Sequence, residues 1–268
     1  MQKIISLNNG LQMPRLGLGV YKTPLQETQR AVSLALEVGY RLIDTAAFYK
    51  NEAGVGNAIR NSGVPREDIF VTTKLFPTRF FRVEEAFERS LERLGLNYID
   101  LYLIHVPFLC KRSVWKALEK IVASGRVKSI GVSNFTIKDL EIISKDSLIT
   151  PAVNQVEFHP FLYRKELLDY CTEHGIVLEA HSPLTHGYRL QDTRISAVAQ
   201  RYQKTNGQIL IRWSLQHGLV VIPKTTRLER LKENIDVFDF EITQEDMAIL
   251  DALNENDQIL RRSFFGRT

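Results

Sequence analysis

The sequence predicts an α/β protein built as a closed (β/α)8 barrel, or TIM barrel, with an N-terminal β-hairpin closing the barrel floor. Three observations predict this fold. Segments with helical spacing of apolar residues alternate with short apolar runs, most of the helical segments end at a glycine, and eight such units fit into 268 residues. Strict alternation favours a parallel sheet, and eight units of this length favour its closure into a barrel.

The predicted hairpin occupies residues 3–13. Its turn signal is Asn-Asn-Gly at 8–10, with apolar residues alternating on both arms. The first barrel strand follows at 16–20 and contains two glycines. The third glycine of a dinucleotide-binding G-x-G-x-x-G motif would fall at Lys22, so no Rossmann fingerprint is predicted there.

The remaining elements follow from the same periodicity. Further strands are expected between Gly39 and Asp44 and over 69–74, 99–105, 127–134, 152–158, 176–181 and 219–222. Helices are expected over 25–38, 52–61, 83–94, 114–123, 137–144 and 165–174, and near 193–203, 207–217, 228–235 and 243–253. Asn51 stands where the second helix would have its N-cap.

No linker or run of like charges divides the chain, so we expect a single domain over residues 1–268. The formal charge of +4 is spread along the sequence, which argues against nucleic acid as a partner. No apolar run reaches the ~18 residues of a membrane helix, and the N-terminus has no signal-peptide pattern. The two cysteines lack metal-ligand spacing. These features predict a cytoplasmic protein, a monomer by default, without a metal site.

Chemistry in such a barrel belongs at the carboxyl ends of the strands. Titratable or amide side chains occupy most of these ends: Asp44, Lys74, His105, Ser133 with Asn134, Gln155 and Glu157, His181 and Lys224. A single Lys or His closing an apolar strand is more often structural. Because eight parallel strands present these groups at one mouth, we interpret them together as an active site.

Four of these groups suit the reduction of a carbonyl group. A free phenol has a pKa near ~10, too high for an efficient acid–base group, and an adjacent ammonium is expected to favour its phenolate form. Tyr49, Lys74 and Asp44 would form such a relay, and a neutral His105 would donate to the substrate oxygen. The hydride must come from a cofactor, because no side chain supplies one.

Several motifs in the same order resemble the aldo-keto reductases, in particular the small microbial members such as 2,5-diketo-gluconate reductases. The motifs are Asp-Thr-Ala-x-x-Tyr-x-Asn-Glu at 44–52, Lys74, Leu-Tyr-Leu-Ile-His-x-Pro at 101–107, Gly-Val-Ser-Asn-Phe at 131–135, Asn-Gln-x-Glu at 154–157, Ser-Pro-Leu at 182–184 and Ile-Pro-Lys at 222–224. The resemblance runs from Leu16 to about Leu253. It implies a (β/α)8 barrel that binds NADPH or NADP⁺ without a Rossmann fold.

The resemblance also implies roles for individual residues. Tyr49 would be the general acid, tuned by Lys74 and Asp44, and His105 would orient the carbonyl. The implied cofactor-binding residues are Ser133, Asn134 and Gln155 at the nicotinamide carboxamide, His181, Ser182 and Leu184 beside them, Lys224, Thr225 and Arg230 at the adenosine 2′-phosphate, and Glu233 and Asn234 near the adenine. A basic, hydroxyl-bearing loop before a helix is by itself a sensible phosphate site.

Two departures from the family pattern affect the pocket. His181 stands where many relatives have an aromatic ring stacked on the nicotinamide, and Val106 stands where a tryptophan is common. The predicted substrate pocket contains Tyr21, Phe76, Val106 and Phe108, and further aromatic candidates are Phe80, Phe81 and Phe265. Substrate identity does not follow from these residues.

The sequence therefore predicts an NADPH-preferring reductase of aldehydes and ketones, with the reverse oxidation also allowed. Two alternatives remain open at this level. A barrel lysine beside a tyrosine would also suit a Schiff-base aldolase using Lys74. A cofactor-binding sensor or regulatory protein with slow turnover would carry the same binding residues.

Overall fold

The structure is a computed structural model that describes residues 3–76, 82–108 and 110–259. Within these residues, eight parallel strands form one sheet in the order β10-β9-β8-β7-β6-β5-β4-β3. Their bounds are β3 (Leu18–Gly19), β4 (Leu42–Asp44), β5 (Phe70–Leu75), β6 (Ile99–Ile104), β7 (Val127–Ser133), β8 (Val153–Glu157), β9 (Val177–His181) and β10 (Val220–Val221). Parallel bridges from Leu16 to Val221 and from Gly19 to Lys224 join the first strand to the last, and the predicted barrel is confirmed.

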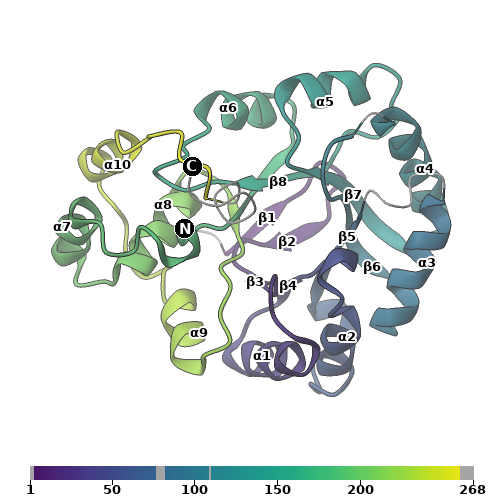
Figure 1. Ribbon diagram of the computed structural model, residues 1–268, viewed down its shortest axis with the longest axis horizontal. Coiled ribbons are helices and arrows are strands. Elements are labelled where there is room, and N and C mark those ends of the chain that lie inside the picture. Colours follow the sequence, from purple (N-terminus) through teal and green to yellow (C-terminus); the bar gives the residue numbers. More distant parts are fainter. Residues whose placement is uncertain (1–2, 77–81, 109, 260–268) are drawn as a thin grey trace.

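The helices form a ring around the strands (Figure 1). They are α1 (Leu25–Val38), α2 (Glu52–Arg60), α3 (Val83–Leu94), α4 (Lys111–Ala123), α5 (Ile137–Ser144), α6 (Lys165–Glu173), α7 (Thr193–Tyr202), α8 (Asn206–Gln216), α9 (Leu228–Ile235) and α10 (Gln244–Asp251). The predicted bounds of α1, α3 and α5 are those observed. The prediction for α4 began at Val114 and was wrong, because its first turn is polar and carries no apolar periodicity.

The N-terminal hairpin is also confirmed. Strand β1 (Ile4–Ser6) pairs antiparallel with β2 (Gln12–Pro14), and the side chains of Leu7 and Met13 are buried. They belong to a hydrophobic cluster with Leu42, Phe70 and Leu101, which lie in the first halves of barrel strands. The hairpin therefore covers the amino-terminal end of the barrel and leaves the opposite end open.

Alternation along the strands decides which side chains point into the barrel. In β5, Phe70 belongs to the interior cluster and Val71 to the larger core between the strands and helices. Because side chains alternate with period 2, Lys74 lies on the same face as Phe70 and points inward. By the same alternation, Asp44 lies on the inward face of β4 with Leu42, and Gln155 lies on the inward face of β8 with Val153. Polar groups near the carboxyl ends of neighbouring strands thus meet inside one barrel.

Asn51 precedes α2, as predicted, but its side chain makes no capping hydrogen bond. Its Nδ2 instead donates to the carbonyl oxygens of Val20 at 2.9 Å and Thr23 at 3.1 Å, and its Oδ1 accepts from the Thr45 hydroxyl at 2.7 Å. The amide is buried, so these bonds tie the segment after β4 to the loop after β3.

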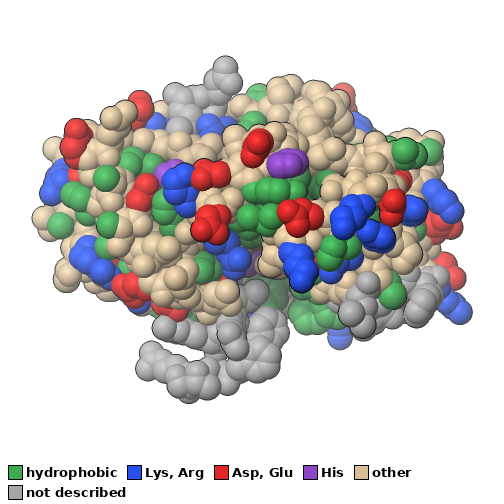
Figure 2. Space-filling model, turned by 90° about the horizontal axis from the view of Figure 1, so that it is seen from above, with side chains coloured by type: hydrophobic (Ala, Val, Ile, Leu, Met, Phe, Trp, Pro, Cys, Tyr) green, Lys and Arg blue, Asp and Glu red, His purple; other side chains and the backbone are tan. Residues whose placement is uncertain are grey.

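The surface carries mixed charge on the side shown in Figure 2, where basic and acidic side chains are interspersed. None of the helices within the described residues is long and apolar enough to cross a membrane.

Helix α2 approaches α3 closely at one glycine, which gives a test of the packing. A Cβ at Gly56 would collide with the backbone carbonyl of Leu94, whereas one at Gly207 in α8 would meet its nearest neighbour at 3.6 Å. We expect Gly56→Ala to lower the free energy of unfolding by about 1–3 kcal/mol, and Gly207→Ala to leave it unchanged or slightly raised. Denaturant unfolding measures both. Equal stability of the two variants would contradict this packing.

Candidate active site

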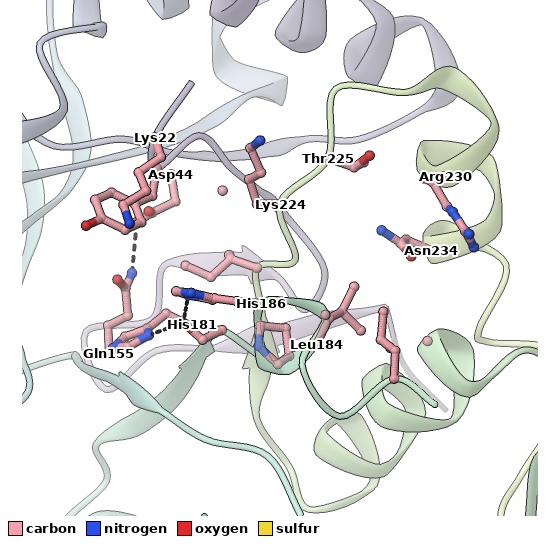
Figure 3. Close-up of a pocket in the computed structure, with 18 of the residues that line it drawn as sticks. Lys22, Asp44, Gln155, His181, Leu184, His186, Lys224, Thr225, Arg230 and Asn234 are labelled. Carbon is pink, nitrogen blue, oxygen red and sulfur yellow. Dashed lines mark hydrogen bonds between the residues drawn. The ribbon is translucent and has the colours of Figure 1, made fainter. Parts of the chain in front are cut away.

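A cavity of about 900 Å³ opens at the carboxyl ends of the strands. Figure 3 shows that it is elongated, with Asp44 and Gln155 toward one end and Arg230 and Asn234 toward the other. Most of the predicted site residues line it: Tyr21, Asp44, Tyr49, Phe76, His105, Val106, Ser133, Asn134, Gln155, His181, Ser182, Leu184, Lys224, Thr225, Arg230, Glu233 and Asn234. The fold thus brings residues from the whole length of the chain to one pocket.

An ion pair lies beneath the Asp44 end of this cavity. Lys74 Nζ donates to both carboxylate oxygens of Asp44, at 2.6 and 2.7 Å, and to the carbonyl oxygen of Thr45 at 2.9 Å. The Lys74 side chain has no exposed surface and Asp44 almost none. Burial by itself would lower the pKa of Lys74, but the attraction and hydrogen bond of Asp44, with smaller contributions from Tyr49 and Glu179, together outweigh it, and the pKa lies above its ordinary value. The lysine therefore stays charged.

Tyr49 lies at the end of a 3₁₀ turn (Ala47–Tyr49) on the loop after β4. Its hydroxyl is 3.4 Å from Lys74 Nζ, and its ring lines the cavity. Burial raises the pKa of Tyr49 to about 12, although the Lys74 ammonium lowers it. The expected stabilisation of the phenolate by Lys74 is therefore present but smaller than the effect of burial. In this state the phenol is protonated at neutral pH and can donate a proton.

His105 follows β6 and faces the same end of the cavity. Its ring centroid lies 5.6 Å from that of Tyr49 and 5.8 Å from that of Phe76. Burial, with the charge of Lys74, lowers the pKa of His105 to about 2, so the imidazole is neutral above that pH. Its Nδ1 is buried without a partner among the described residues. A neutral imidazole here can donate one hydrogen bond to a bound oxygen atom.

Side chains from the next strands form a polar wall beside these groups. Asn134, at φ +62°, donates through Nδ2 to the carbonyl oxygen of His105 at 3.2 Å and to the Ser133 hydroxyl at 3.0 Å. Gln155 Nε2 donates to Asp44 Oδ2 at 2.8 Å, so the wall is connected to the buried ion pair. Short polar side chains tolerate this left-handed conformation, which turns the Asn134 amide toward the cavity wall.

His181 ends β9 and continues the polar wall. Its Nε2 lies 3.1 Å from Asn134 Oδ1, and its Nδ1 lies 3.0 Å from the Ser182 hydroxyl, which in turn lies 2.9 Å from His186 Nε2. Burial lowers the pKa of His181 to about 3, so the ring is neutral at physiological pH. The ring is held by hydrogen bonds on both nitrogens. It therefore has a fixed orientation at the carboxyl end of β9.

The far end of the cavity carries cations. Lys224 and Thr225 lie on the loop that leads into α9, and Arg230 lies in the first half of that helix (Figure 3). Arg230 Nη1 donates to both carboxylate oxygens of Glu233, at 2.9 and 2.6 Å. Asn234 is buried beside them. A hydroxyl, an ammonium and a guanidinium near a helix start can bind a phosphate group.

The predicted substrate pocket is only partly assembled by the described residues. Tyr21, Phe76 and Val106 line the cavity, whereas Phe108 does not and packs against the main hydrophobic core instead. Phe80, Phe81 and Phe265 lie outside the described residues.

Sequence reasoning missed several residues that line the cavity. Phe48 stacks on Phe76 with ring centroids 4.3 Å apart, and Lys22 projects into the cavity from the loop after β3. Lys22 has a φ of +53°, a conformation that no sequence signal predicts for lysine. Residues of the loop after β9 and of the start of α8 complete the wall: Pro183, Gly187, Leu190, Gln191, Ser196, Thr205, Asn206 and Gly207. A capping signal, Thr205 with Gln208, was available for α8.

Known proteins of similar sequence and structure agree with this architecture. The family model for the aldo/keto reductase family matches residues 14–255. Glyoxal reductase of Bacillus subtilis is 48% identical over 263 residues, covering 97% of this chain and 95% of that protein. Morphine 6-dehydrogenase of Pseudomonas putida is 45% identical over 274 residues, covering 96% and 93%. An aldo-keto reductase from a Medee basin deep-sea metagenome superposes with a TM-score of 0.92 at 44% identity, covering 95% and 96%.

A parallel barrel with titratable and cationic side chains around a cavity at its open end has the architecture of the (β/α)8-barrel enzymes, whose active sites lie at that end. The chain belongs to the aldo/keto reductase family. Membership in this family supports the assignment of the protein as an oxidoreductase, one that acts on small-molecule carbonyl compounds with a nicotinamide cofactor.

The half-buried histidines of the cavity make stability depend on acidity. The pKa of His181 is about 3 in the folded protein and ~6.5 in the unfolded chain, so between these values only the unfolded chain binds the proton. The contribution of the neutral ring to the free energy of unfolding is therefore complete above pH ~6.5 and is lost as the pH falls toward 3. We expect the fall in the free energy of unfolding between pH 7 and about 4.5 to be smaller in His181→Gln than in wild type by about 2–3 kcal/mol. Exposed His174→Gln is the matched control. Equal falls in all three proteins would refute a His181 imidazole held neutral by the fold.

Proposed function

We propose that this protein is an NADPH-dependent reductase of aldehydes and ketones, able to run the reverse oxidation. The observation that carries the proposal is the Tyr49 phenol, which lines the cavity directly above a buried Lys74–Asp44 ion pair. The cations at the other end of the same cavity support a phosphate-bearing cofactor that lies along it.

The side chains around the cavity fit such a cofactor. Gln155, Asn134 and Ser133 would hold the nicotinamide carboxamide, and His181, Ser182 and Leu184 would lie against the ring and the adjoining part of the molecule. Lys224, Thr225 and Arg230 would hold the 2′-phosphate, with Glu233 and Asn234 near the adenine. The reduced nicotinamide supplies the hydride when it is bound.

The protein's own contribution is to place and protonate the carbonyl oxygen. Tyr49 donates its phenolic proton to that oxygen as negative charge develops there, and Lys74 stabilises the phenolate that remains. His105, neutral in this environment, donates a second hydrogen bond to the same oxygen. Asp44 keeps Lys74 charged and fixed in position.

Two alternatives make different use of the same residues. A Schiff-base aldolase would need Lys74 to reach its substrate, but Lys74 is fully buried, is bound by three oxygen acceptors and is not among the described residues that line the cavity. A cofactor-binding sensor would bind NADPH without reducing carbonyl compounds. A titration with NADPH and NADH followed by a panel of carbonyl substrates, glyoxal first, separates these possibilities. Tight binding with no turnover across the panel would favour the sensor.

Removing the Tyr49 hydroxyl tests the assignment of the acid. We expect Tyr49→Phe to lower the rate constant for carbonyl reduction by about 10²–10⁴-fold, with little change in the Kd for NADPH, because the phenol acts on the substrate. Tyr21→Phe is the matched control, since its ring lies 5.0 Å from that of Tyr49 and lines the same cavity. Similar losses in both variants would show that Tyr49 is not the proton donor.

Arg230 tests the preference for NADPH. We expect Arg230→Ala to weaken NADPH binding by about 10- to 100-fold and NADH binding much less, because only NADPH carries the 2′-phosphate. Arg227→Ala removes the same charge one turn earlier, at an exposed residue that does not line the cavity. The Kd values of Arg227→Ala for NADPH and NADH should stay close to those of the wild-type protein. Equal weakening of NADPH and NADH in Arg230→Ala would remove the 2′-phosphate role.

A further inference from the structure

The amide of Gln155 is held by two buried carboxyl groups. Its Nε2 donates one hydrogen bond to Asp44 Oδ2 at 2.8 Å and the other to Glu179 Oε2 at 2.7 Å. The bond to Asp44 is visible in Figure 3. Both hydrogens of the amide nitrogen are thus directed into the barrel, while the residue itself lines the cavity.

Glu179 is the less obvious member of this group. It lies in β9 directly opposite Gln155 in the parallel register, and its side chain has no exposed surface. It is not among the described residues that line the cavity, so it touches neither end of the proposed cofactor site. Its Oε1 is buried and has no hydrogen-bond partner in the described part of the chain.

The charges in the barrel interior favour a neutral Glu179. Lys74 supplies the positive charge here. Its ammonium donates to both carboxylate oxygens of Asp44 and makes no hydrogen bond to Glu179. A second buried carboxylate with an unpartnered oxygen would be strongly unfavourable. Burial, with the negative charge of Asp44, raises the pKa of Glu179 to about 8. Glu179 is therefore a carboxylic acid at neutral pH.

This arrangement determines which atom Gln155 presents to the cavity. The carboxylate of Asp44 only accepts hydrogen bonds, so the amide must turn its nitrogen toward it. Glu179 accepts the second hydrogen and prevents a buried, unsatisfied N–H. The remaining polar atom, Gln155 Oε1, is left for a donor in the cavity, and a carboxamide NH₂ group is such a donor.

We propose that Glu179 is a positioning residue for the cofactor, which holds the Gln155 amide so that Oε1 is ready to accept a hydrogen bond from the nicotinamide carboxamide. The inference rests on the proposed function, because it assumes that a nicotinamide binds beside Gln155. It assigns a role to a buried acid that makes no contact with substrate or cofactor.

Three single variants and one double variant test this role. Glu179→Leu removes the acceptor, Glu179→Gln keeps a neutral carbonyl acceptor in its place, and Gln155→Ala removes the side chain through which Glu179 would act. The Kd for NADPH is measured by fluorescence quenching, and the KM for glyoxal at saturating NADPH is measured alongside it. Thermal unfolding shows whether each variant is folded. Should Glu179→Leu not fold, Glu179→Asp, whose shorter side chain withdraws the carboxyl from Gln155, takes its place in the same set.

We expect Glu179→Leu to raise the Kd for NADPH about three- to ten-fold, the size of the loss when one side chain is no longer pre-organised. Glu179→Gln should restore an affinity close to wild type, and KM for the carbonyl substrate should not change. Adding Glu179→Leu to Gln155→Ala should weaken binding no further, because the two residues act as one unit.

Two results would overturn the inference while leaving the proposed function intact. In the first, the wild-type protein binds NADPH and reduces carbonyl compounds, but the losses of NADPH affinity in Glu179→Leu and Gln155→Ala add up in the double variant. The other is an equal loss in Glu179→Gln and Glu179→Leu. Failure of the wild-type protein to bind either NADPH or NADH would instead refute the proposed function itself, and the role of Glu179 with it.

Discussion

The site depends on one constraint, the burial of an ammonium group inside a hydrophobic barrel. Lys74 is surrounded by protein and needs an anion and further acceptors within hydrogen-bonding distance, which Asp44 and the carbonyl oxygen of Thr45 provide. The loop after β4 then holds Tyr49 against the same ammonium. Gln155 extends the network across the barrel to β9. The positions of the Tyr49 phenol and of the amide wall both follow from how this charge is accommodated.

Much of the fold was predictable because its signals are local. Helical periodicity followed by a glycine with positive φ gave the bounds of α1 and α3, where Gly39 and Gly95 end the helices in the left-handed conformation. Strands at the barrel seam were less predictable. The segments around Leu18 and Val220 form strands of only two residues, because part of their pairing is made by isolated bridges at closure. Closure depends on residues far apart in the chain.

The candidate site was predictable to the extent that polar residues end apolar strands. Lys74 and His105 stood out for that reason. Glu179 did not, because one acid within a strand gives no sign of whether it faces the barrel interior or a helix. The ionisation of Tyr49 could not be predicted either, since it depends on the balance between burial and the nearby ammonium. Both quantities come from three-dimensional packing.

The seam between β3 and β10 has a consequence for the order in which the protein is made. Synthesis proceeds from the N-terminus, so Asp44, Tyr49 and Lys74 leave the ribosome long before Val221, which pairs with Leu16 to close the barrel. The cationic end of the cavity, around Arg230, is made later still. A nascent chain therefore holds these side chains without a closed barrel around them, and the cavity is completed only when this long-range contact forms.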